Sequence, residues 1–161
     1  MSLQRCKKNL DYTSKEVQYQ LARRLNSLCK KLNESFGINY GGCCYVAYCI
    51  ARLLEKDNFN FSLVVFDKRY ELKKFVELSE LPEPMDHYAI IIESDDASSG
   101  INCCEDDYDD FYQDFKVSSK HILEYYLNNR WNSSYNIINN VYVKSLIERV
   151  YYEFTDNLRK E

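Results

Sequence analysis

Two short apolar runs rich in β-branched residues, FSLVVFD (61–67) and DHYAIIIES (86–94), stand between pairs of segments with helical periodicity. Runs of this kind are typical of buried strands, because β-branched side chains pack well on a pleated surface. The order along the chain is therefore helix, helix, strands, helix, helix. This order predicts an α+β domain in which the helices pack on a small antiparallel sheet.

The two segments before the first strand have apolar residues three and four positions apart, which indicates amphipathic helices. The first helix is expected at about 14–36, with Thr13 or Ser14 as its cap and Gly37 as its end. The second is CCYVAYCIARLLEK, which spans 43–56. Together with the strands it predicts a central core over about 39–117.

Between and after the strands the pattern is mixed. The stretch 68–84 reads either as a short helix or as a loop closed by Pro82 and Pro84, and DDASSG (95–100) reads as a turn before a short strand, INCC (101–104). Two C-terminal helices are expected over about 119–159, the first capped by Ser118 or Ser119. We find no internal repeat and no linker, so the 161 residues are expected to form a single domain.

Charge and cysteine usage narrow the class of protein. The formal net charge of −4 argues against nucleic acid as the main partner. No window of 18 apolar residues predicts a membrane span, and the N-terminus lacks the apolar core of a secretory signal. The seven cysteines include two adjacent pairs, a pattern that favours reduced thiols and a cytoplasmic protein over a disulfide framework.

One cysteine stands where a nucleophile is expected. Cys43 follows Gly41 and Gly42 at the start of the second predicted helix, where free N–H groups and the helix dipole lower the pKa of a thiol. Adjacent glycines allow a close approach of the backbone to a substrate. Cys43 is preferred over Cys44 because small residues follow it at four-residue spacing, whereas Tyr48 follows Cys44. Cys6, Cys29, Cys44 and Cys49 read as small buried apolar residues.

A thiol nucleophile needs a base and a residue that orients the base. Of the two histidines, His87 opens the second apolar strand, whereas His121 lies among polar neighbours in a predicted helix and reads as a surface residue. Asn102 follows the DDASSG turn, and a hairpin with that loop would bring it close to His87. These positions predict a Cys43–His87–Asn102 triad.

The segments GGCCYVAYCIARLLEKDNFNFSLVVFD, HYAIII and INCC resemble the core of the papain-like cysteine hydrolase superfamily, and are closest in arrangement to its transglutaminase-like branch. Members place the cysteine at the start of a central helix, after a glycine, with the histidine and an Asp or Asn beginning successive strands. The resemblance implies nucleophile, base and orienting roles for Cys43, His87 and Asn102. It covers about Asn39 to Cys104.

This resemblance implies a thiol-dependent hydrolase or acyl transferase that acts on an amide bond without a cofactor. Papain carries a glutamine before its cysteine as an oxyanion donor, and Gly37 stands at the matching position here. Asn39, Tyr40 and Gly42 are the remaining candidates for contacts with the oxyanion or substrate.

Three other interpretations of these residues stay open. A zinc site is less favoured, because adjacent cysteine pairs rarely direct both sulfurs at one metal. A non-catalytic protein-binding module could keep the same fold, with the tyrosine-rich segments EYYLNNRWNSSY and RVYYEF as its partner surface. The stretch from Glu93 to Phe115 contains nine acidic residues and no Lys or Arg. It reads as a solvated loop or as a flank of the site that attracts a cationic protein or peptide substrate.

Overall fold

The computed structural model describes residues 14–38, 42–66, 75–81, 87–94, 97–101, 112–129 and 139–160. Four α-helices, one short 3₁₀ helix and four strands occur in these residues. Their bounds are α1 Lys15–Phe36, α2 Cys43–Lys56, β1 Asn60–Phe66, η2 Leu78–Glu80, β2 His87–Ser94, β3 Ala97–Ile101, β4 Tyr112–Phe115, α3 Ser119–Asn129 and α4 Asn139–Lys160. The predicted α+β class is confirmed, with the expected order of helices and strands.

The four strands form one antiparallel sheet in the order β3-β2-β1-β4. The central pair β1–β2 has a continuous register that runs from Asn60 opposite Glu93 to Phe66 opposite His87. β3 pairs with the outer side of β2, and β4 pairs with the end of β1, where Phe115 lies opposite Leu63.

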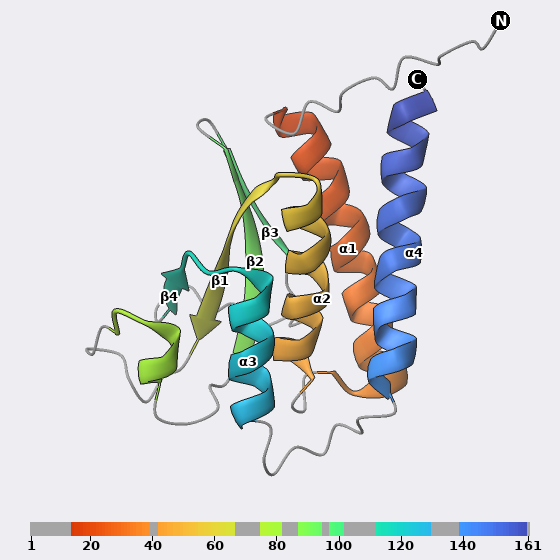
Figure 1. The fold of residues 1–161 in the computed structure, drawn as a ribbon. Coiled ribbons are helices and arrows are strands. Elements are labelled where there is room, and N and C mark those ends of the chain that lie inside the picture. The colour runs from red at the N-terminus through yellow and green to blue at the C-terminus, as the bar shows by residue number, and fades with distance from the viewer. Residues whose placement is uncertain are drawn as a thin grey trace, which may run out of the picture.

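The helices cover the sheet face onto which the largest apolar side chains project. Because side chains alternate along a strand, Leu63 and Val65 of β1 and Tyr88, Ile90 and Ile92 of β2 all join the buried core. Helix α2 lies against β1 and β2, and α1 lies against β3; α3 packs on α2, and α4 on α1 and α2 (Figure 1). In the described part of the chain, no helix has the length and apolar character that crossing a membrane requires.

Helix α1 begins and ends at the signals that the sequence contains. The Ser14 hydroxyl accepts a hydrogen bond from the Val17 N–H at 3.5 Å, the contact expected of an N-cap. Gly37 has a left-handed φ of 64°, and its N–H donates to the Asn33 carbonyl at 2.8 Å. Glycine adopts this conformation without the steric cost of a Cβ, which explains why the helix ends here.

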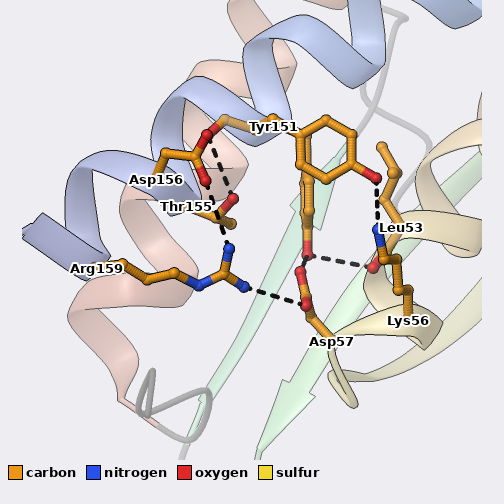
Figure 2. Close-up of polar contacts among 8 residues, drawn as sticks. Leu53, Lys56, Asp57, Tyr151, Thr155, Asp156 and Arg159 are labelled. Atoms are coloured by element: carbon orange, nitrogen blue, oxygen red, sulfur yellow. Dashed lines mark hydrogen bonds and ion pairs between the residues drawn. The ribbon is translucent and has the colours of Figure 1, made fainter. Parts of the chain in front are cut away.

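A polar cluster fastens α4 to the C-terminal end of α2 (Figure 2). The buried Tyr151 hydroxyl lies 3.2 Å from the Leu53 carbonyl and also contacts the Asp57 carboxylate. Arg159 reaches the same carboxylate at 3.5 Å, and the Lys56 ammonium donates to the Tyr152 hydroxyl at 2.9 Å. These contacts join residues distant in sequence, so they fix the axis of α2 relative to the last helix.

Two parts of the sheet differ from the sequence expectation. Residues 97–100, expected in a turn, belong to β3, since Ser98 and Ser99 pair with Glu93 and Ile92 of β2. The expected strand at 101–104 is described only at Ile101, which ends β3. Strand β4 was not expected, because its sequence YQDF contains no β-branched residue. In both cases pairing with a strong neighbouring strand decides the conformation against local propensity.

Candidate active site

The fold brings the beginning of α2 and the beginning of β2 to the same end of the molecule (Figure 1). Residues 57–59 connect α2 to β1, which runs back along the helix. β2 is antiparallel to β1 and therefore runs in the direction of α2. Cys43, the first residue of α2, and His87, the first residue of β2, consequently lie at this shared end.

Gly42 occupies the N-cap position of α2 with an αR conformation and provides no side-chain cap. Its N–H donates to the Ile38 carbonyl at 2.7 Å, and its carbonyl accepts from the Val46 N–H at 3.0 Å. The Gly42 amide is thus engaged within the chain, so in this conformation it does not serve an oxyanion as donor. Asn39 and Tyr40, the other two residues expected at an oxyanion or substrate contact, lie outside the described residues.

All four described cysteines are buried in the core. Cys29, Cys44 and Cys49 are buried among core side chains, as expected for small apolar residues. Burial raises the pKa of the Cys29 and Cys49 thiols to about 12. Burial, followed by the charge of Cys43, raises the pKa of Cys44 well above its usual range. These three thiols remain protonated at neutral pH, which makes them poor nucleophiles.

Cys43 is also buried, with 4% of its surface exposed. It is the first residue of α2, directly before Cys44, at the end where the helix dipole favours a thiolate.

His87 is 1% exposed and pairs with Phe66 at the end of β1. The two rings lie 5.7 Å apart between centroids. Alternation along β2 places His87 on the side of the strand opposite to Tyr88, which belongs to the buried core and contacts Tyr125 of α3. As the first residue of the strand, His87 sits at the end of the sheet, where its ring reaches α2 only by turning past the strand end.

Asn102 lies outside the described residues. The strand before it runs toward the His87 end of the sheet and ends at Ile101, which pairs with Ile90, three residues after His87 in β2. His121, expected on the surface, is exposed in α3 and its Nδ1 lies 3.0 Å from the Ser118 hydroxyl.

Two tyrosines of α3, which the sequence indicated only as part of a possible partner surface, adjoin this end of the molecule. The ring of Tyr126 lies 5.4 Å from that of Tyr45, two residues after Cys43. The hydroxyl of Tyr125 lies 2.7 Å from that of Tyr88, the residue after His87. The sequence signal was the pair of tyrosines on the apolar face of a predicted helix, but their partners depend on how α3 packs.

A cleft of about 720 Å³ lies between η2, β4 and α3. Its residues come from three separate segments, so the sequence has no local motif that predicts it.

The chain matches no protein-family model, and no curated protein or solved structure is significantly similar to it.

Proposed function

We propose that this protein is a thiol-dependent hydrolase or acyl transferase of amide bonds, with a papain-like, transglutaminase-like arrangement of Cys43, His87 and Asn102. The observation that supports it is the coincidence of three chain positions. The starts of α2 and β2 lie at one end of the fold, and β3 runs toward that end before Asn102; these positions correspond to the proposed nucleophile, base and orienting residue.

In the proposed reaction, His87 takes the proton of the Cys43 thiol and the thiolate attacks the substrate carbonyl. A carbon–sulfur bond forms, and the Cys43 backbone N–H helps to hold the oxyanion. His87 then protonates the departing amine as the carbon–nitrogen bond breaks, which leaves a thioester. Water or a second amine attacks the thioester and releases the acid or a new amide, while Asn102 holds the imidazole in orientation.

This reaction makes two demands on the structure. The substrate carbonyl has to reach a Cys43 thiol that is almost fully buried at the start of α2. The His87 ring has to turn past the end of β2 toward the helix, away from the Phe66 ring with which it packs.

Site-resolved alkylation of the native protein tests the proposal. We expect iodoacetamide to modify Cys43 fastest, at a pH well below the ordinary thiol pKa of about 8.5, with sites and rates read by peptide mass spectrometry. His87→Ala and His87→Gln should abolish this advantage. The exposed His121→Ala is the matched control and should leave it unchanged.

Two results would count against the reaction. Cys43 could react no faster than the buried Cys44 and Cys49, or it could react fast and keep that rate in both His87 variants. Circular dichroism of each variant separates loss of the base from loss of the fold, because the histidine is buried.

The burial of Cys43 and the orientation of His87 favour a second candidate, a binding module that keeps the fold without the chemistry. Most of the described tyrosines first considered for its partner surface do not support such a role. Tyr125, Tyr126 and Tyr151 are 6%, 7% and 0% exposed and belong to the core, whereas Tyr152 is half-buried. Slow alkylation at Cys43 would favour this second candidate.

A further inference from the structure

The cleft of about 720 Å³ between η2, β4 and α3 has the size of a ligand site. Its floor is made of four buried apolar side chains, Leu78, Leu81, Phe115 and Tyr125. One wall is fixed to the sheet, since the Phe75 N–H donates to the Gln113 side-chain oxygen at 3.0 Å. The same wall is closed into a turn by the capping contacts of Glu77 and Glu80. The cleft is thus built from packed elements.

The rim of the cleft is acidic. Three exposed carboxylates, Glu77, Asp114 and Glu124, line it. Among the described lining residues the only Lys or Arg is Lys116, whose ammonium is paired with Glu93. The described part of the rim therefore carries an excess of negative charge above an apolar floor, which attracts cations and repels phosphate-bearing ligands.

The floor of the cleft is joined to the candidate active site. Tyr125 forms part of the floor and is hydrogen-bonded through its hydroxyl to Tyr88, next to His87. Its neighbour Tyr126 packs on Tyr45, near Cys43. A ligand in the cleft thus lies against α3, the helix that contacts Tyr88 next to His87 and Tyr45 near Cys43.

We infer that this cleft binds an extended peptide segment in which a lysine or arginine stands beside an apolar residue. The apolar side chain fills the floor against Leu78 and Phe115, and the cationic side chain lies among the carboxylates of Asp114 and Glu124. The identification of this peptide as the substrate of Cys43 rests on the proposed function, whereas the binding of the peptide in the cleft does not.

Direct binding tests the inference without turnover. The full chain carrying Cys43→Ala is titrated with a labelled peptide that has two adjacent lysines between leucines, and with its counterpart in which glutamates replace the lysines. We expect fluorescence anisotropy to show binding of the lysine peptide only. Asp114→Asn with Glu124→Gln should weaken it at least about threefold at low salt, whereas Glu34→Gln, an exposed carboxylate on α1, should not.

Charge reversal and amide mapping decide the remaining possibilities. Asp114→Lys with Glu124→Lys should make the protein prefer the glutamate peptide. When the lysine peptide is titrated, the changes in backbone amide NMR chemical shifts should cluster at 75–81 and 113–128. Equal binding of both peptides, or shifts confined to other elements, would overturn the inference. If the peptide binds but Cys43 of the wild type is not reactive toward iodoacetamide, the peptide site stands and the proposed reaction is rejected. If Cys43 is reactive but no peptide binds, the proposed reaction stands and the peptide site is rejected.

Discussion

The hydroxyls of Tyr88 and Tyr125 lie 2.7 Å apart in the interior, and their rings meet edge to face at 5.8 Å between centroids. Tyr88 belongs to β2 directly after His87, and Tyr125 belongs to α3 and to the floor of the cleft. This pair is therefore the direct link between the strand that carries the proposed base and the helix that forms one wall of the cleft. Two polar hydroxyls are tolerated in a core because one donates a hydrogen bond to the other, which offsets part of the cost of their burial.

A double-mutant cycle on this pair measures the link. We expect Tyr88→Phe and Tyr125→Phe each to lower the free energy of unfolding by about 1–2 kcal/mol, because each leaves a buried hydroxyl without this partner. The double variant should cost less than the sum, with a coupling of about 1 kcal/mol. Urea unfolding of the four proteins gives these values, and strict additivity would show that the hydroxyls contribute independently.

How far the sequence determines this fold is clearest at α2 and β4. The bounds of α2 coincide with the predicted segment, since apolar residues recur at helical spacing throughout and glycines precede it. β4 has no such signal, and its four residues become a strand because Phe115 and its neighbours pair with β1. Long, periodic segments carry their own structure, whereas short edge strands depend on a partner far away in the chain.

The contact between Glu55 and α3 gives a second stability prediction. One Glu55 carboxylate oxygen accepts from the Ser119 N–H at 2.9 Å and the other from the Ser119 hydroxyl at 3.0 Å. The carboxylate thus binds an amide at the start of α3, where the helix dipole favours negative charge. Glu55→Ala should cost about 1–2 kcal/mol of unfolding free energy and Glu55→Gln less, as measured by urea unfolding.

Glu34→Ala is the control for this comparison, because Glu34 is exposed on α1. It should change the unfolding free energy by less than about 0.5 kcal/mol. Equal effects of Glu34→Ala and Glu55→Ala would mean that the contact with Ser119 does not stabilise α3.

Adjacent tyrosines on α4 provide a matched comparison of buried and exposed hydroxyls. Tyr151→Phe removes the contacts of a fully buried hydroxyl with the Leu53 carbonyl and the Asp57 carboxylate, so it should cost about 1.5–3 kcal/mol. Tyr152→Phe removes only an exposed contact with Lys56 and should cost less than about 1 kcal/mol. Urea midpoints at constant m-value measure both, and similar losses would contradict the role assigned to the cluster in Figure 2.

The candidate site shows a different limit of sequence reasoning. Chain order suffices to bring the starts of α2 and β2 together, because a short connection and an antiparallel pair leave few alternatives. Side-chain direction at His87 is different, since it depends on register, and a shift of one residue exchanges the two faces of a strand. The acidic cleft is a third case, because its rim and floor come from separate segments that lie next to one another only in the folded chain.

The buried thiols predict a loss of stability at alkaline pH. The pKa values of Cys29 and Cys49 are raised by burial from 9.0 to about 12 in the folded protein. The folded state therefore holds these protons between pH 9 and 12, whereas the unfolded chain releases them. The stabilisation is fully present below about pH 9 and is lost as pH rises, by up to about 1.4 kcal/mol per pH unit for each thiol. Urea unfolding at a series of pH values from 7 to 10.5 should show this decline in the free energy of unfolding. The free energy should fall less steeply with pH in Cys29→Ala and Cys49→Ala than in the wild type. An equally steep fall in these variants would assign the decline to other groups.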